Sequence, residues 1–371
     1  MANQSPVSGP SAPVGGDYDV AVVGAGIVGL GLAAAALERG LRVVVVERAH
    51  TVQGASVRNF GHVGVTIHAG EAAEFARRTR ELWLRLAERA GFWHRASGAV
   101  MVARHEDELA ALNESGVGRL LTAAETTALV PVADAVGGAH LADDLQVDPR
   151  EAAPAVAAHL EAEGVAFRWR TSALGVEPGI LHTSRGEIRA ATIVVAVGHD
   201  VDQLYPVIAE EHGVERCALD MMLADGVGLG LPLLTGSSML RYSAIASAPS
   251  AADIRVRLER QEPGVFTHDV NQMYTQRPDG TLIVGDTHDV GISVSPFQDE
   301  AAFALLERLT ADLFGHPLRM RQRWQGVYAK GPEDFLRAAP SDGVRIVSVT
   351  TGIGMSTGLG LAESVIADLW G

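Results

Sequence analysis

Three glycines near the beginning of the sequence have the spacing of a loop that holds a phosphate group. Gly24, Gly26 and Gly29 form G-x-G-x-x-G between the β-branched run DVAVVGAG and a run of small residues with helical spacing. The first glycine permits a tight turn, the second lets a pyrophosphate approach the backbone, and the third lets helix and strand pack closely. At the start of the helix, the N–H groups of Ile27 and Val28 are expected to face the anion. The sequence therefore predicts a dinucleotide site.

An acidic residue follows at a distance that suits this site. Glu47 ends the second buried strand, LRVVVVE, eighteen residues beyond Gly29, where a carboxylate can bind both ribose hydroxyls. An acid there disfavours a 2′-phosphate and hence NADP, while NAD and FAD both stay open. FAD is favoured because the motif lies at the start of the fold and a second strand-glycine segment, TIVVAVGHDVDQL, returns later. That segment is expected to bring Ala196 and Gly198 to the cofactor.

A second glycine-rich turn, TTGIGMSTGLG, lies near the end of the chain. It follows the apolar run VRIVSV and precedes LAESVIADL, which has helical spacing. Residues 354–358 spell G-x-S-x-G, the nucleophile elbow of serine hydrolases, with Ser356 as the candidate nucleophile. In that fold a histidine follows the serine in the chain, whereas the last histidine here is His316. The pattern therefore favours a turn that holds a ligand.

These motifs need a scaffold in which strands and helices alternate. The sequence predicts strand, glycine turn, helix and strand over 19–47, a helix over 71–91 and a helix over 148–164. Residues 215–287 are mostly β-like and include a hairpin that turns at 278–280. We predict an α/β fold in which a Rossmann-like nucleotide-binding domain contains an inserted β-sheet-rich domain. The expected boundaries are 18–70, 140–210 and 335–371 for the first domain, and 71–139 and 211–334 for the second.

Composition and net charge argue against several classes of binding partner and metal site. A formal net charge of −15, with 47% hydrophobic and 20% charged residues, fits a globular protein and argues against a nucleic-acid partner. The single cysteine, Cys217, excludes a disulfide framework and a cysteine-rich metal site, and it fits the reducing cytoplasm. His50, His62 and His68 lie close together, but no pair has the i, i+4 spacing of a helical metal site. No metal is predicted.

Two segments resemble targeting signals only superficially. Residues 1–17 are rich in Ser, Pro and Gly and lack the basic start and apolar run of a signal peptide, so they are expected to form a flexible tail. Residues 20–37 carry no charge and approach the length of a membrane span. Their glycines and their change from strand-like to helix-like pattern indicate a buried βα unit instead. No membrane partner is predicted.

Five stretches of the sequence, taken together, resemble one family of flavoproteins. They are DVAVVGAGIVGLGLAAAALERGLRVVVVER, GASVRNFGHVG, TIVVAVGHDVDQL, MYTQRPDGTLIVGDT and TTGIGMSTGLGLAESVIADL, and they span nearly all of the chain past residue 17. In this order they resemble the D-amino-acid oxidase, glycine oxidase and sarcosine oxidase (DAO) family. The resemblance implies a glutathione-reductase-type fold with FAD as cofactor. SVRNFG and GIGMST look most like a bacterial branch of the family that is associated with phosphonate breakdown.

The resemblance also implies how the flavin is held. In the family, the loop after Glu47 covers the flavin, and the position matched by Val176 brings its backbone to the adenine. The glycines of residues 350–360 would let the backbone pass close to the flat ring. A helix beginning near Gly358 would direct its N–H groups at the flavin N1–C2=O edge. The further residues expected at the cofactor are Arg48, Ser56, Arg58, Asn59, Phe60, Gly61, Gly352, Gly354, Met355, Ser356 and Thr357.

The reaction that the resemblance implies is oxidation of a C–N bond. The hydrogen on the carbon next to nitrogen leaves as hydride to flavin N5, and water hydrolyses the resulting imine. Oxygen then reoxidises the flavin and gives H2O2. Sarcosine-oxidase members often attach FAD to a cysteine near the C-terminal region, but Cys217 lies in another segment. Noncovalent FAD is therefore expected.

The substrate is suggested by a departure from the family pattern. Amino-acid-oxidising members carry an arginine for the substrate carboxylate in a stretch that resembles RQRWQGVYAKGPE. Its position falls on Tyr328, and Lys330 follows two residues later. Such a pair, with Tyr274, Gln276 or Arg241, suits a tetrahedral anion, so an aminoalkylphosphonate or its N-methyl derivative is the preferred substrate. The residues expected on the substrate side are His62, Tyr274, Tyr328, Lys330 and Met355.

Other functions stay open at this stage. The nearest alternative is a glycine, sarcosine or D-amino-acid oxidase or dehydrogenase. The segment VGDTHD resembles the Gly-Asp motif of flavin monooxygenases, although the glycine-rich helix start that should follow it comes only at residues 350–360. A noncatalytic flavoprotein is a further alternative, and the oligomeric state is left open.

Overall fold

The computed structural model describes residues 17–371, so residues 1–16 of the predicted tail lie outside the described range. At one end of the molecule, five neighbouring strands pair in parallel. In sheet order they are β19 (Val344–Thr351), β12 (Gly186–Val195), β1 (Tyr18–Val23), β2 (Val43–Val46) and β9 (Ala166–Arg168).

Side-chain alternation along these strands decides what covers each face of the parallel sheet. Val20 and Val22 lie in one core with four helices, whereas Ala21 and Val23 lie in a second core on the opposite face. The four helices are α1 (Ile27–Glu38), α2 (Gly70–Ala90), α5 (Pro149–Ala162) and α11 (Gly354–Trp370). The opposite face carries β10 (Ala173–Glu177), β11 (Ile180–Thr183), the 3₁₀ helix η2 (Gly198–Gln203) and α6 (Pro206–Glu211).

The other end of the molecule is an antiparallel sheet with its own helices. Its strands are β5 (Ala99–Ala103), β6 (Arg119–Thr122), β7 (Gly137–Leu141), β13 (Glu215–Ala224), β14 (Leu233–Thr235), β15 (Met273–Gln276), β16 (Leu282–Gly285), β17 (Asp289–Gly291) and β18 (Met320–Ser341). Its helices are α3 (Glu106–Ser115), α4 (Ala123–Leu129), η3 (Gly236–Leu240), α7 (Ser243–Ala246), α8 (Ala251–Gln261), α9 (Gly264–Thr267) and α10 (Glu300–Phe314). Only β5 and β14 pair in parallel here.

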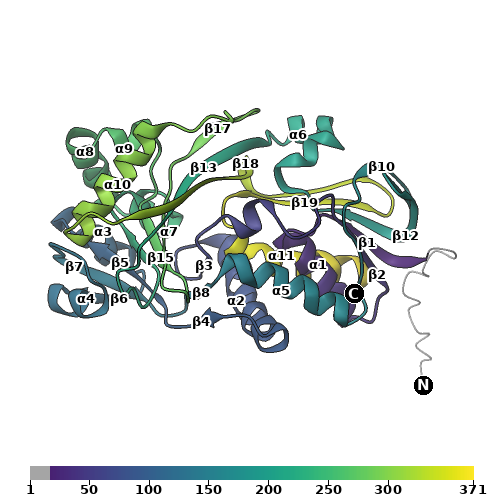
Figure 1. Ribbon diagram of the computed structural model, residues 1–371, viewed down its shortest axis with the longest axis horizontal. Coiled ribbons are helices and arrows are strands. Elements are labelled where there is room, and N and C mark those ends of the chain that lie inside the picture. The colour runs from purple at the N-terminus through teal and green to yellow at the C-terminus, as the bar shows by residue number, and fades with distance from the viewer. Residues whose placement is uncertain (1–16) are drawn as a thin grey trace, which may run out of the picture.

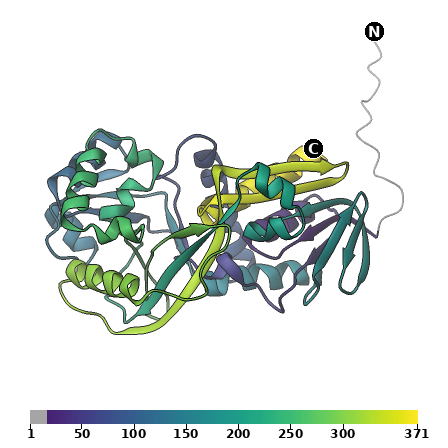
Figure 2. The same ribbon diagram turned by 90° about the horizontal axis from the view of Figure 1, so that it is seen from above.

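One long strand joins the two ends. The first half of β18 pairs with β13, and its second half pairs with β19, so a single 16-stranded sheet runs through the molecule. Figure 1 shows α1, α2, α5 and α11 at one end, α3, α8, α9 and α10 at the other, and β13 and β18 between them. Figure 2 shows the same separation from above. A small sheet of β3 (His62–Val63), β8 (Leu145–Val147) and β4 (His94–Arg95), preceded by the 3₁₀ helix η1 (Gly54–Val57), lies beside the parallel end.

Most of the predicted elements are confirmed, and two predictions are wrong in detail. Helices α2 and α5 and the hairpin of β15 and β16 lie where the sequence predicts them. The region 215–287 also contains α7, α8 and α9, which were missed because short amphipathic helices inside a β-rich segment give weak periodicity. Helix α11 begins at Gly354 rather than near Gly358, since the Ser356 and Thr357 N–H groups already bond to the Ile353 carbonyl. Within residues 17–371, no helix has the length and apolar character to cross a membrane.

Candidate active site

The glycine turn between β1 and α1 is packed so closely that two of its positions exclude a side chain. Gly24 has a φ of +103°, and a Cβ there would lie 2.5 Å from the carbonyl oxygen of Ala196. A Cβ on Gly29 would lie 1.9 Å from the carbonyl oxygen of Gly24. Both distances are well inside van der Waals contact, so only glycine fits at these positions. The turn therefore holds the start of α1 against the end of β12, the arrangement that a dinucleotide-binding turn needs.

Ser56 and Glu47 bring polar side chains to the same turn. The Ser56 hydroxyl accepts the N–H of Ile27 at 2.9 Å, at the N-terminus of α1. One Glu47 oxygen accepts the N–H of Ala25 at 2.9 Å, and the other accepts the N–H of Ala49 at 2.8 Å. The residues predicted to contact phosphate and ribose thus lie together, although they come from three separate parts of the sequence.

The segment after η1 is held by its own side chains. Asn59 donates to the carbonyl of Ala55 at 2.7 Å, and its amide oxygen accepts the N–H of Gly61 at 2.7 Å. A Cβ on Gly61 would lie 2.0 Å from the carbonyl oxygen of Val147, so this glycine lets the segment press against β8. Phe60 is buried in the core of the antiparallel end. The segment therefore crosses from the glycine turn to the other half of the molecule.

Two arginines predicted at the cofactor contact other segments. Arg48 pairs with Asp200 in η2. Arg58 donates to the carbonyl of Gln325 in β18 at 3.3 Å, and both arginine side chains are largely exposed. The remaining predicted positions also lie around the carboxyl ends of the parallel strands or pack beside them. Gly198 begins η2 with a φ of +61°, Val28 packs against Gly358 of α11, and Val176 lies in the core opposite α1.

The N-terminus of α11 is tied to the segment that follows Gly61. Ser356 accepts the N–H of Gly64 at 2.9 Å, and Thr357 donates to the carbonyl of Ile353 at 2.9 Å. The carbonyl of Met355 accepts the indole N–H of Trp83 at 2.9 Å. Among the described residues, Ser356 has no histidine partner. Its hydroxyl therefore joins two segments and is not activated as a nucleophile.

Tyr328 lies where the two halves of the molecule meet. A Cβ on Gly352 would lie 2.9 Å from Cζ of the Tyr328 ring, so the ring covers the glycine that precedes α11. The imidazole of His288 meets the same ring edge-on, with centroids 6.4 Å apart. The Tyr328 hydroxyl is hydrogen-bonded to the thiol of Cys217, its neighbour on β13. An aromatic and polar surface thus faces the predicted flavin loop.

Arg241, just after η3, extends this surface. Its Nη2 lies 3.0 Å from Nδ1 of His288 and 2.6 Å from a carboxylate oxygen of Asp269. Asp286, which follows β16, is fully enclosed and accepts the side-chain N–H of Asn271 at 3.1 Å. Burial raises the pKa of Asp286 to about 7, although Arg241 acts in the opposite direction. Burial and Arg241 together lower the pKa of His288 to about 3, so its imidazole is neutral at pH 7.

His62 belongs to a buried pair on the other side of Ser356. Its Nε2 lies 2.8 Å from one oxygen of Asp144, and the second oxygen accepts the N–H groups of Val65 and Thr66. Burial alone would raise the pKa of Asp144, but the hydrogen bonds from His62 and the backbone hold that pKa below its usual value. His62 is therefore held in position by an ionised partner.

His68 lies between this pair and the antiparallel end. Its ring meets Tyr242, the residue after Arg241, edge-on with centroids 6.4 Å apart. Burial lowers the pKa of His68 to about 4, so it is neutral at pH 7. Its Nε2 is buried and has no hydrogen-bond partner within residues 17–371. His68 thus presents a polar atom that the described chain leaves unsatisfied.

Lys330 and Tyr274 occupy contrasting positions. Lys330 lies two residues beyond Tyr328 on β18, hence on the same face of the strand, at the point where β18 passes from β13 to β19. Its half-buried side chain forms no hydrogen bond or ion pair with any residue of 17–371. Tyr274 instead lies on the opposite face of the sheet, where its hydroxyl bonds to Gln272 and Thr310. The structure therefore does not bring Tyr274 to Tyr328.

The side chain of Gln276 is also bonded to residues other than those around Tyr328. Its side-chain oxygen accepts three consecutive N–H groups, those of Val227, Gly228 and Leu229, at 2.9 to 3.0 Å. Of the three extra residues considered for the substrate anion, only Arg241 lies with Tyr328.

Comparison with known proteins decides the family. The model of the protein family described as "FAD dependent oxidoreductase" (DAO) matches residues 19–369. The chain belongs to the DAO family of FAD-dependent oxidoreductases. A search of curated protein sequences found no match.

Solved structures share the fold of this oxidoreductase. Glycine oxidase from Geobacillus kaustophilus is 19% identical with a TM-score of 0.75, over 95% of this chain and 94% of that one. L-proline dehydrogenase from P. horikoshii is 18% identical with a TM-score of 0.76, over 96% of this chain and 95% of that one. Dithionite-reduced L-alpha-glycerophosphate oxidase from Mycoplasma pneumoniae, with FAD bound, is 18% identical with a TM-score of 0.74, over 95% of each chain.

FAD is the cofactor of this oxidoreductase, and its residues fit such a group. Gly24 and Gly29 are buried and form the tight turn that begins α1, whose N-terminus is the positive end of the helix and stabilises a pyrophosphate. The Ala25 and Ile27 N–H groups of this turn are bonded to Glu47 and Ser56. Glu47 stands at the end of β2, where a ribose binds. The N-terminus of α11 supplies a second positive helix end for a flavin ring that becomes negatively charged on reduction. Within residues 17–371, no group of three or more His, Cys, Asp or Glu could hold a metal ion.

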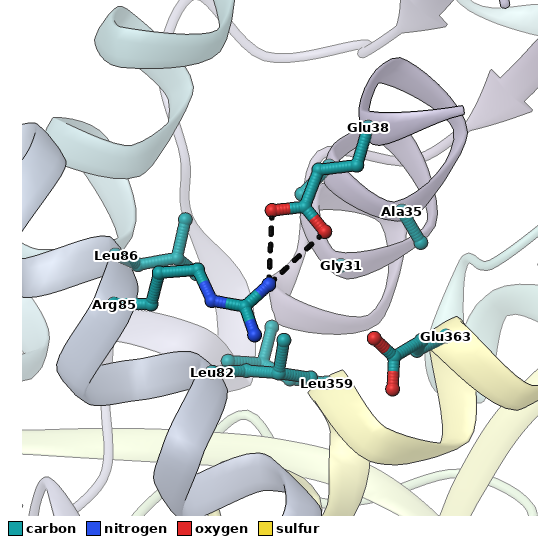
Figure 3. A pocket seen from close by; sticks show the side chains of 9 residues that line it. Gly31, Ala35, Glu38, Leu82, Arg85, Leu86, Leu359 and Glu363 are labelled. Atoms are coloured by element: carbon teal, nitrogen blue, oxygen red, sulfur yellow. Dashed lines mark hydrogen bonds and ion pairs between the residues drawn. The ribbon is translucent and has the colours of Figure 1, made fainter. Parts of the chain in front are cut away.

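Two hollows elsewhere in the oxidoreductase do not belong to this site. A small pocket lies between α1, α2 and α11, where Arg85 bonds to both oxygens of Glu38 at 3.2 Å (Figure 3). Small and apolar residues line most of the rest, and the Glu363 carboxylate also borders it; this carboxylate is paired with Arg78. A cleft of about 380 Å³ lies in the antiparallel half, lined among others by Arg104 and Arg257.

Sequence reasoning missed several of the polar residues that surround Tyr328 and His62. Asp286 and His288 lie in VGDTHD, which was noticed only as a possible monooxygenase motif. Lys330, which the sequence predicts on the substrate side, is also the only lysine in a sequence with 30 basic residues. Asp144, Asp269 and His68 carry no local signal, since their partners are distant in the sequence.

Proposed function

We propose that this oxidoreductase oxidises the C–N bond of a small amine that carries an anionic group, preferably an aminoalkylphosphonate or its N-methyl derivative. The observation that carries the proposal is the pair of Tyr328 and the unpaired, half-buried Lys330 beside the predicted flavin loop. A carboxylate is planar and best served by the arginine fork that family members place at position 328. A lysine ammonium with three rotatable donors and a tyrosine hydroxyl suit the three oxygens of a tetrahedral anion better.

The proposed chemistry separates the roles of cofactor and protein. When bound, FAD supplies the two-electron acceptor for the hydrogen on the carbon next to nitrogen. As that C–H bond breaks, the nitrogen loses a proton and a C=N bond forms, and water converts the imine into an aldehyde and a free amine. Molecular oxygen takes up the two electrons and two protons as H2O2. The nitrogen must be neutral for hydride loss, so the amine has to lose its ammonium proton before the C–H bond breaks.

The proposal includes a division of labour along the chain. We propose that residues 18–70, 140–210 and 335–371 bind FAD, that 71–139 and 211–334 form the substrate side, and that the protein is cytoplasmic. FAD is proposed to be noncovalent, because the one thiol is buried and burial raises the pKa of Cys217 to about 11. A protonated, buried thiol is a poor nucleophile. Acid precipitation should release the yellow flavin, and flavin retained on the denatured chain would contradict this.

Anaerobic flavin reduction tests the function. The holoenzyme is mixed with 2-aminoethylphosphonate, its N-methyl derivative, glycine, sarcosine and D-alanine, and loss of flavin absorbance is followed. The phosphonates are expected to reduce the flavin faster. Faster reduction by the carboxylates would instead identify an amino-acid oxidase or dehydrogenase, and no reduction by any amine would indicate a noncatalytic flavoprotein. H2O2 formation in air separates an oxidase from a dehydrogenase.

A single substitution tests the role of Lys330. Lys330→Ala is expected to raise KM for the phosphonate substrate while FAD content stays unchanged. Because the chain has no other lysine, an amine-specific reagent should modify only Lys330 and the N-terminus, and methyl phosphate, which has no amine to consume the reagent, should protect Lys330. Loss of FAD from Lys330→Ala would show that the residue supports the cofactor instead.

A further inference from the structure

Arg241 has the geometry of an anchored anion-binding group. Its Nη2 is occupied by the carboxylate and carbonyl oxygens of Asp269, at 2.6 and 3.1 Å, and by His288. Its Nη1 and Nε have no partner within residues 17–371. The side chain is only 26% exposed, so the contacts of Nη2 fix the guanidinium while single N–H donors of Nη1 and Nε are left for a ligand. An arginine held in this way loses little conformational entropy when it binds an anion.

Lys330 approaches the same cluster from a different element. Arg241 comes from the turn after η3, whereas Lys330 comes from β18. Lys330 shares one face of β18 with Tyr328, and Arg241 contacts His288 at 3.0 Å. Both cations also lower the pKa of His288. His288 meets the Tyr328 ring that covers Gly352. The two positive charges therefore converge on the surface that faces the predicted flavin loop.

The charges around this surface do not cancel below pH 7. Asp269 balances Arg241, and Asp286 is largely protonated there because its pKa is about 7. Lys330 is left without a counter-charge among the described residues. A ligand that brings negative charge would thus find one unbalanced cation and a second whose partner, Asp269, is 60% exposed to solvent.

We infer that Arg241 and Lys330 form a two-cation clamp that binds a doubly charged tetrahedral group of the substrate. The inference rests on the proposed function and adds Arg241 as the residue that sets the preferred charge. Two cations stabilise a bound dianion more than a bound monoanion, because each added charge pair contributes further Coulomb energy in a partly buried site. A carboxylate would leave one of the two cations desolvated and unpaired.

Binding of simple anions to the holoenzyme tests the clamp without turnover. The probes at pH 7 are methyl phosphate, mainly a dianion because its second pKa is about 6, methanesulfonate, a tetrahedral monoanion, and acetate, a planar monoanion. Kd is measured by calorimetry or by perturbation of the flavin spectrum. Arg241→Met and Lys330→Met should each weaken methyl phosphate about tenfold or more, with smaller losses for the monoanions. Arg260→Met, an exposed arginine on α8, is the matched control and should change nothing.

The outcomes separate the clamp from the proposed function. If Arg241→Met keeps its FAD and melting temperature but binds methyl phosphate within twofold of the wild type, the clamp is wrong. If the clamp variants lose anion binding but no anionic amine reduces the wild-type flavin, the clamp stands and the proposed reaction fails. If Arg241→Met does not fold, Arg241→Gln removes the charge but keeps a polar side chain, and it should also bind methyl phosphate about tenfold more weakly than the wild type. Wild-type affinity in Arg241→Gln, with a tenfold loss in Lys330→Met, would leave Lys330 alone and overturn the clamp.

Discussion

The ring of Tyr328 lies against Gly352, so that a Cβ on this glycine would come within 2.9 Å of the ring Cζ and 3.1 Å of its hydroxyl. Gly352 also has a φ of +79°, a conformation that disfavours other residues. This contact joins β18, which carries the proposed substrate residues, to the turn that begins α11.

We expect Gly352→Ala to displace Tyr328 and to raise KM as well as to lower stability. The left-handed backbone alone costs about 1 kcal/mol. Gly116→Ala is the matched control, because Gly116 has a φ of +64° with nothing within 4 Å of an added Cβ. It should lower the melting temperature without changing KM. If both variants behave alike, the contact with Tyr328 has no functional consequence.

Ser56→Ala should weaken FAD binding. The hydroxyl accepts the Ile27 N–H at the start of α1, and loss of such a cap costs about 1 kcal/mol, or about fivefold in affinity if the cofactor depends on it. Fluorescence titration of apoprotein with FAD measures the change. Ser184→Ala removes a similar bond, to the Ser172 N–H, in the β10–β11 region, and should leave FAD affinity unchanged. Equal FAD affinity in Ser56→Ala and wild type would exclude Ser56 from the cofactor site.

Asp144→Asn should destabilise the protein strongly, by about 3–5 kcal/mol, because it breaks a buried, charged hydrogen-bond group. The folded pKa of Asp144 is depressed, so its contribution is present above the unfolded pKa near 3.8 and is lost as pH falls through the folded value. Thermal melts at pH 7 and at a pH well below 3.8 should therefore show a difference between wild type and variant that is large at pH 7 and smaller at the acidic pH. The exposed neighbour Asp143 provides the control, and Asp143→Asn should melt like the wild type at both pH values.

Anion affinity should fall as pH rises through about 7. Asp286 has a raised pKa of about 7, so it is neutral below that pH and becomes an anion that competes for Arg241 above it. Methanesulfonate keeps a constant charge, and its Kd between pH 6 and 8.5 reports the protein alone. Asp286→Asn can still accept from Asn271 and should flatten the profile. The charged and titratable groups around Asp286 are Cys217, Arg241, Tyr242, Asp269, His288 and Tyr328. An unchanged profile in Asp286→Asn would show that Asp286 does not control anion affinity.

The parts of the site that sequence reasoning predicted all lie in short stretches with a recognisable local pattern. Gly24, Gly26 and Gly29 lie between a strand and a helix whose patterns are legible in a few residues, and Glu47 follows at a set distance along the next strand. Steric exclusion at Gly24 and Gly29 requires glycine whatever the rest of the chain does. The start of α11 was placed four residues late, because a helix that begins with Gly, Met, Ser and Thr has little periodic signal.

Residues of the substrate side depend on long-range pairing, which local patterns do not encode. Met273 and Tyr274 are adjacent in the sequence, yet strand alternation sends Met273 to the core that contains Tyr328 and Tyr274 to the core beneath α10. A shift of one residue in register would have exchanged them.

The amino-acid sequence by itself determined the dinucleotide turn, the α/β class and the family resemblance, because each follows from short-range spacing and side-chain size. The tertiary structure alone decided which charged residues share one surface. Arg241, His288 and Lys330 come from a turn, a strand end and a strand interior, and they meet only because β13, β16 and β18 lie side by side in one sheet. Electrostatic attraction acts through distance in space, and sheet pairing sets that distance.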